Sequence, residues 1–150
     1  MKYKLGSPEV IGGITLHRVI RLNDGQVGGY IEHEGNLSQG GNAWVYGNAR
    51  VYGNARVGGN ARVYGDAEVY GDAEVYGNAR VAGNALFTYV GQYFVSIYDD
   101  NIRVGCQFHS SKKWRGFTKE EISSMEVDAE EWWAKHKKFV FQMHKHVNGK

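Results

Sequence analysis

Cysteine and proline are almost absent from this sequence. Of its 150 residues, only Cys106 is a cysteine and only Pro8 is a proline. A single thiol excludes an internal disulfide framework and is typical of a reducing compartment. Long apolar runs are missing too: the first residues carry no apolar signal region, and no stretch approaches the roughly 18 apolar residues of a membrane span. We therefore expect a cytoplasmic protein without membrane association.

An excess of charge of either sign is also lacking. Lys and Arg total 18 and Asp and Glu total 16, which leaves a formal net charge of +2. This balance gives little attraction to a polyanion, so nucleic acid is not an expected partner. Glycine, by contrast, is abundant, with 21 residues. In an unordered sequence this content would indicate disorder, but here the glycines fall in register, which indicates a repeat protein.

The repeat has a period of six residues and no insertions. From Gly41 to Thr88 the sequence consists of eight consecutive units of the type Gly-Asn-Ala-Arg-Val-Tyr. Three series mark it: glycine from Gly41 to Gly83, alanine from Ala43 to Ala85, and valine from Val45 to Val81, closed by Phe87. Side chains alternate between the two faces of an extended segment, so Ala and Val are predicted to face inward. Gly-Asn and Gly-Asp supply the corners, because these residue types tolerate a left-handed backbone.

This pattern resembles the left-handed parallel β-helix of hexapeptide-repeat proteins, in which three units form one triangular coil. The resemblance implies a mainly β protein with about three to four coils. We predict an N-terminal β cap over residues 1–26, the β-helix over residues 27–88, and a tail over residues 89–150. The cap is needed because an open end of a β-helix exposes unpaired backbone and apolar interior.

Residues 27–40 keep the period imperfectly and are predicted to form a degenerate first coil. In this alignment Ile31 and Leu37 take the alanine position, while His33 and Gln39 take the inward valine position. After Leu86 the period ends.

In the tail, residues 89–98 and 102–108 are predicted to form a hairpin around an Asp-Asp-Asn turn. Capping signatures at Thr118 and Asp128 predict two helices, over residues 118–125 and 129–146.

Three units per coil place residue i next to residue i+18, about 4.8 Å away. One outward column then contains Trp44, Arg62 and Arg80 and no acid, with Tyr46 and Tyr64 in the column beside it. The other two faces pair opposite charges, which stabilises neighbouring strands. Their columns are Glu32, Arg50 and Glu68 on one face, and Ser38, Arg56 and Glu74 on the other.

The column without an acid is the candidate oligomer interface. Aromatic residues and arginine are enriched in interface cores, and left-handed β-helix proteins commonly form threefold trimers. We therefore predict a homotrimer whose interface contains Trp44, Tyr46, Arg62, Tyr64 and Arg80. The alternative is that the tyrosines merely stabilise exposed strands, as their β propensity allows.

The tail offers a weak metal motif and several aromatic residues. Cys106 and His109 have C-x2-H spacing, and three more histidines follow, but a structural zinc site needs four converging ligands. Packing or surface roles are the favoured interpretation, so no metal and no cofactor is expected. Trp132 and Trp133 belong to an apolar stripe at helical spacing with His136, Val140 and Met143, which is typical of a core rather than of a stacking platform.

The segments Gly-Gly-Tyr-Ile-Glu and Asn-Leu-Ser, followed by the repeat array, resemble a family of phage and prophage hexapeptide-repeat proteins. No settled activity comes with that family. The resemblance implies a phage origin and, with it, the cytoplasm of a bacterial host.

Acyltransferases share this fold and carry a catalytic histidine, often on a loop that interrupts the coils. Here no loop and no histidine interrupts residues 41–88, and His33 is predicted to face inward, where a general base is poorly placed. An enzyme is therefore the less favoured alternative.

The favoured hypothesis is a non-catalytic, oligomeric binding protein: a rigid rod for self-assembly and a tail that recognises a host or phage protein, such as a host defence component. The candidate partner-binding residues are Phe108, His109, Trp114, Arg115 and His136. A further alternative is an anionic small molecule, such as a nucleotide, bound between subunits by Arg62 and Arg80.

Overall fold

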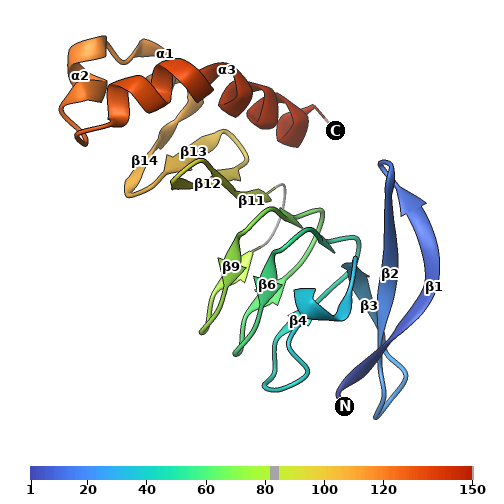
Figure 1. Cartoon of the computed structure of the whole chain (residues 1–150). Coiled ribbons are helices and arrows are strands. Elements are labelled where there is room, and N and C mark those ends of the chain that lie inside the picture. The colour runs from blue at the N-terminus through green and yellow to red at the C-terminus, as the bar shows by residue number, and fades with distance from the viewer. Residues whose placement is uncertain (82–84, 150) are drawn as a thin grey trace.

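A computed structural model of the chain describes residues 1–81 and 85–149. It consists of an N-terminal hairpin, a parallel β-solenoid and a C-terminal tail of strands and helices. The hairpin and the tail lie at opposite ends of the solenoid (Figure 1). The hairpin is formed by β1 (Tyr3–Ile11) and β2 (Ile14–Arg21). It leads into the solenoid through β3 (Val27–Ile31) and a short 3₁₀ helix, η1 (Glu34–Asn36). The predicted fold class, a mainly β repeat protein with a parallel β-helix, is confirmed.

The coils of the solenoid are built from strands of two residues, each made of an outward residue followed by a buried valine. These strands are β4 (Trp44–Val45), β5 (Arg50–Val51), β6 (Arg56–Val57), β7 (Arg62–Val63), β8 (Glu68–Val69), β9 (Glu74–Val75) and β10 (Arg80–Val81). The valines and the alanines up to Ala73 are buried, as the alternation predicts. The glycine that opens each unit from Gly41 to Gly77 has φ between 59° and 69°, a conformation that glycine adopts without steric cost. Gly83, which ends the predicted glycine series, lies outside the described residues.

The strands stack into three faces. Face 1 contains β4, β7 and β10, face 2 contains β3, β5, β8 and β11 (Ala85–Val90), and face 3 contains β6 and β9. Val45 pairs with Val63, which pairs with Val81, so the predicted spacing of 18 residues holds. Face 2 is part of a nine-stranded sheet in the order β1-β2-β3-β5-β8-β11-β12-β13-β14, which runs from the hairpin to the tail.

The first coil differs from the predicted register. Ile31 pairs with Val51 and Leu37 with Val57, so partners are 20 residues apart. The spacing returns to 18 at Asn42, whose amide side chain bonds Asn60, so the two extra residues lie between Leu37 and Asn42. Ile31 and Leu37 therefore occupy the valine position, and their assignment to the alanine position is wrong.

The same shift corrects two predicted columns and the place of His33. Tyr30, rather than Glu32, lies next to Arg50, and Ser38 lies next to Gly58 rather than next to Arg56. His33 is exposed instead of inward, and its side chain caps η1 by accepting a hydrogen bond from the Gly35 amide.

The strands of the tail form a four-stranded antiparallel meander. Its members are β11, β12 (Tyr93–Tyr98), β13 (Asn101–Val104) and β14 (Gln107–Ser110). The predicted turn at residues 99–101 is present, with Asp99 at φ 49°. The two predicted strands, however, are each divided by a further turn, at Gly91 (φ 61°) and Gly105 (φ 56°).

Three helices follow where two were predicted. They are α1 (Ser111–Gly116), α2 (Lys119–Ser123) and α3 (Ala129–Asn148). Thr118 forms the predicted capping box with Glu121 at the start of α2. Asp128 precedes α3 but makes no side-chain capping bond. Within the described residues, no helix is long and apolar enough to cross a membrane.

The described residues form two hydrophobic cores. The first is the alanine and valine interior of the solenoid, where Phe87 packs with its edge or face against Phe94 and Tyr98 of the meander. The second lies between the meander and the three helices and contains Trp114, Trp132 and Trp133. The tail is thus a separately packed layer that also covers one end of the solenoid.

Candidate functional site

Trp44 of face 1 is covered by the N-terminal hairpin. Its side chain is only 3% exposed and packs edge-to-face on Tyr3, with ring centroids 6.3 Å apart. The Arg21 guanidinium of the hairpin lies over its ring, 5.5 Å from the centroid. Trp44 therefore takes the predicted outward position but is not exposed, and it has almost no surface to offer a partner.

The rest of face 1 is open. Arg62 and Arg80 are exposed and lie in register, and within residues 1–81 and 85–149 neither has an ion pair. Tyr46 stacks on Tyr64 with ring centroids 5.0 Å apart, and both are half-buried. Face 1 therefore presents two adjacent cations beside a tyrosine stack.

Face 2 is covered by the tail. Glu68 is only 4% exposed. Its carboxylate forms an ion pair with the Arg50 guanidinium at 2.8 Å and lies 3.3 Å from Nε2 of His146 on α3. Tyr70, the next outward residue, donates its hydroxyl to the sulfur of Met143 at 3.3 Å, and burial followed by the Glu68 charge raises the pKa of that hydroxyl. These contacts fix the C-terminal half of α3 against the solenoid.

The aromatic residues of the tail form its core. Trp114 donates its indole N–H to the Ile102 carbonyl, and Trp132 donates to the Val90 carbonyl, both at 2.8 Å. Trp133 packs on Trp114, with ring centroids 4.9 Å apart. All three tryptophans are buried, so the predicted core role of Trp132 and Trp133 agrees with their position, and Trp114 is not available for contact with a partner.

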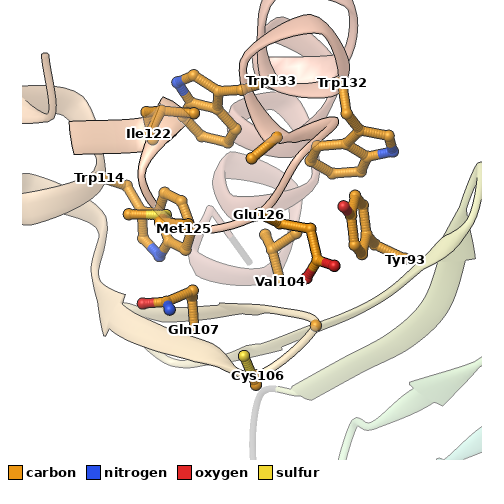
Figure 2. Close-up of a pocket in the computed structure, with 12 residues that line it drawn as sticks. Tyr93, Val104, Cys106, Gln107, Trp114, Ile122, Met125, Glu126, Trp132 and Trp133 are labelled. Atoms are coloured by element: carbon orange, nitrogen blue, oxygen red, sulfur yellow. The ribbon is translucent and has the colours of Figure 1, made fainter. Parts of the chain in front are cut away.

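A small apolar cavity lies beside this core, between the β13–β14 turn, α2 and α3 (Figure 2). Its volume is about 60 Å³, and its walls include Tyr93, Trp114, Ile122, Met125, Trp132 and Trp133. Cys106 and Glu126, both exposed, also line it. A space of this size fits a small apolar group or one or two water molecules, and no larger ligand.

The other predicted partner-binding residues lie in three different places. Phe108 is 45% exposed on β14, beneath the Arg103 guanidinium at 5.0 Å. Its neighbour His109 packs on the Trp114 and Phe117 rings, and burial lowers the pKa of His109. Phe108 and His109 do not form a single site with Arg115 and His136, the other two predicted partner-binding residues.

Arg115 on α1 is exposed and lies over the ring of Phe141, 4.6 Å from its centroid. The His136 ring packs against Trp132 at a tilt of 45°, with ring centroids 4.9 Å apart, near the β11–β12 turn. Burial and then the Lys135 charge lower the pKa of His136. In the described part of the chain no group of three or more His, Cys, Asp or Glu residues converges as metal ligands would.

One feature that sequence reasoning missed is a basic groove between α1 and α3. It has a volume of about 620 Å³, and its walls include Arg115, Lys138, Phe141, Gln142, Lys145 and Asn148. We call this set the α1–α3 groove. The α3 residues of the groove recur every three or four positions, and this spacing was visible in the sequence. Helix α1 was not predicted, so there was no reason to place Arg115 opposite the lysines of α3.

The repeat units have a recognisable counterpart among known families. A family model described as the YdcK beta solenoid repeat matches residues 43–59 and 55–71. No curated protein sequence matches the chain. The matched segment lies entirely within the coils and includes none of the tail. The chain is therefore a β-solenoid repeat protein, in which the central coils are similar to the YdcK beta solenoid repeat.

Proposed function

We propose that this chain is a non-catalytic, phage-type binding protein in which the solenoid is a rigid support and the tail recognises a protein of the host or the phage. The observation that carries the proposal is the contrast between the two surfaces. The strands of faces 1 and 3 have only two residues each and repeat one backbone pattern from coil to coil, whereas the tail presents the exposed Phe108, the apolar cavity and the α1–α3 groove within one short segment. A host defence component in the bacterial cytoplasm is one partner of this kind.

Rigid attachment of the tail supports the same proposal. The tail continues face 2 through the pairing of β8 with β11, and α3 contacts Glu68 and Tyr70. A recognition surface held in this way loses little conformational entropy on binding. The solenoid would thus present the tail in a fixed orientation.

Self-association through face 1 is the second part of the proposal. Tyr46, Tyr64, Arg62 and Arg80 remain exposed or half-buried there, and we propose a homotrimer in which this face meets its copies. Light scattering should give a multiple of the 16.8 kDa chain mass, and Arg62→Glu with Arg80→Glu should lower it. A wild-type mass of a single chain at micromolar concentration would remove the trimer.

Site-specific cross-linking in bacterial cells tests the role of the tail. Phe108 and Tyr76 are similarly exposed, at 45% and 48%, but one lies on β14 and the other on face 3. Each is replaced with the photo-cross-linking residue benzoylphenylalanine in the full-length protein. We expect a defined second protein to be captured from position 108 and not from position 76. Capture from position 76 alone would make the solenoid the recognition surface.

An anionic small molecule on face 1 is the second candidate function. It is favoured by one observation, the side-by-side position of Arg62 and Arg80 without an ion pair in the described residues. A ligand at 100 times its dissociation constant stabilises a protein by about 2.7 kcal/mol. Nucleotides and acyl-CoA tested by thermal shift should therefore raise the midpoint of wild type and not that of Arg62→Gln with Arg80→Gln.

A further inference from the structure

The α1–α3 groove brings together three cations from two helices. Arg115 comes from α1, and Lys138 and Lys145 come from α3. The two lysines are seven residues apart, which places them two helical turns, roughly 10 Å, apart along one side of α3. All three side chains are exposed.

None of these cations forms an ion pair with another described residue: across residues 1–81 and 85–149 no ion pair involves Arg115, Lys138 or Lys145. Asp100 interacts electrostatically with Arg115, but its carboxylate already accepts hydrogen bonds from Ser111 Oγ at 2.6 Å and from His144 Nε2 at 3.1 Å. One acid that is already hydrogen-bonded elsewhere stands against three cations, so most of the positive charge of the groove is left for an external partner.

Arg115 is held in place for such a partner. Its guanidinium lies over the Phe141 ring at 4.6 Å, which restricts the side chain while leaving it exposed. A guanidinium held in this way can donate two parallel hydrogen bonds to one carboxylate. Lys138 and Lys145 add two mobile point charges to this fixed donor.

Charge complementarity restricts the partner to an anion, and the aromatic geometry restricts it further. Single-stranded nucleic acids bind through bases that stack on open aromatic faces. Here Arg115 lies over the Phe141 ring, and Trp133 packs on that ring edge-to-face with centroids 5.5 Å apart. The formal net charge of +2 adds little long-range attraction for a polyanion.

We propose that the α1–α3 groove binds an acidic segment of a partner protein, with one carboxylate on Arg115 and others on Lys138 and Lys145. The proposal rests on the proposed function of the tail and names the chemistry of the segment that the tail would recognise. An extended chain rises about 3.3 Å per residue. The lysine spacing therefore suits acidic residues about three positions apart.

Fluorescence anisotropy with full-length protein tests this groove. The probe is fluorescein-labelled deca-glutamate, compared with deca-glutamine and with a ten-nucleotide oligothymidine. We expect deca-glutamate to bind at least tenfold more tightly than deca-glutamine. The groove variant R115Q/K138Q/K145Q should lose tenfold or more of that affinity.

The matched control removes three cations from elsewhere. Lys4, Arg56 and Lys137 are exposed and lie outside the groove, so K4Q/R56Q/K137Q has the same net charge as the groove variant. Its affinity for deca-glutamate should stay within twofold of wild type. Unchanged thermal midpoints would show that both variants are folded, and a groove variant that unfolds is replaced by the single variant R115Q, with an expected loss of at least threefold.

Three results would overturn the proposal: equal binding of deca-glutamate and deca-glutamine, an equal loss in both triple variants, or tighter binding of oligothymidine than of deca-glutamate. The last would assign the groove to nucleic acid. Cross-linking from position 108 separates this outcome from the proposed function. Capture of a partner there, with no preference for deca-glutamate, removes the acidic segment and leaves the binding role of the tail intact.

Discussion

In the solenoid almost every interior position holds alanine or valine, whereas the core of the tail holds three tryptophans among larger aliphatic residues. Each coil contacts only its neighbours, and its interior is a stack of small, equal layers. The tail instead closes one irregular core between a meander and three helices. Tolerance to change should therefore differ between the two regions, because a repeated small side chain carries less of the total stability than a single large one.

Two pairs of oppositely charged neighbours show the same contrast at the surface, and the first of them, Arg50 with Glu68, forms an ion pair at 2.8 Å. Arg50 pairs in register with Glu68 on face 2, and Arg56 pairs in register with Glu74 on face 3. The tail covers the first pair and leaves the second exposed. One sequence pattern thus lies in two environments, and the difference between them is due to the tail.

The largest effect is expected from the core of the tail. Trp114→Ala should lower the free energy of unfolding by about 3–5 kcal/mol, because it leaves a cavity and removes the donor to the Ile102 carbonyl. Val63→Ala, in the solenoid interior, should cost about 1–3 kcal/mol. Chemical denaturation measures both. A larger loss from Val63→Ala would reverse the comparison of the two interiors.

The buried acid comes next. Glu68→Ala leaves Arg50 without its partner under the tail and should cost about 3 kcal/mol, towards the low end for buried pairs because Arg50 is partly exposed. Glu74→Ala on the open face 3 should cost no more than about 1 kcal/mol. Urea denaturation of the two variants gives this difference directly. Equal costs would mean that the tail does not change the environment of face 2.

A pH dependence is expected from the tail. The Ser111 hydrogen bond, together with His144, holds the pKa of Asp100 below its ordinary value of 3.8. A carboxyl with a lowered pKa stabilises the fold above its ordinary pKa, and this contribution is lost as the pH falls through the lower folded value. The thermal midpoint of Asp100→Asn should therefore lie below that of wild type at neutral pH, and the gap should narrow below about pH 4.

Asp99→Asn is the control for this measurement. Asp99 is the adjacent turn residue, its carboxylate has no hydrogen bond in the described part of the chain, and asparagine tolerates its φ of 49°. The midpoint of this variant should follow wild type at every pH. A gap for Asp100→Asn that does not change with pH would assign the effect to shape rather than to charge.

The smallest effect is expected on face 3. Gly58 is the one position between Tyr46 and Tyr76 where the unit lacks its tyrosine, and the Tyr76 ring lies where a Cβ at Gly58 would stand, 2.5 Å from its nearest atom. Tyr76 is about half exposed and free to move aside, so Gly58→Tyr should form a stack like Tyr46 on Tyr64. We expect a change within about 0.5 kcal/mol, measured by denaturation. A loss above this range would show that the coils are not interchangeable.

Much of the solenoid was predictable because its information is local and repeated. The six-residue period gave the strands, the corners and the buried valines, and the capping box at Thr118 gave the start of α2. The predicted register of the first coil was wrong because two extra residues can enter any corner without changing the local sequence pattern. Only the change in partner spacing, from 20 residues at Leu37 to 18 at Asn42, reveals where they lie.

The tail and Trp44 were harder to predict for a different reason. Gly91 and Gly105 divide strands whose aromatic and β-branched residues favour longer runs. Trp44 is buried because a hairpin from the start of the chain folds over face 1. The α1–α3 groove likewise joins residues from separate helices. In each case the deciding contact connects segments that are distant in sequence.

The continuous nine-stranded sheet through face 2 also determines how the molecule would respond to mechanical load. Its strands lie across the long axis of the solenoid, so the hydrogen bonds between coils point along that axis (Figure 1). A pull between the N-terminal hairpin and the tail would load these bonds in tension, one row at a time, instead of shearing many rows together. Faces 1 and 3 contribute only two-residue strands to each row. Under tension the protein should therefore open coil by coil at low force, each step releasing about 18 residues, the repeat length of one coil.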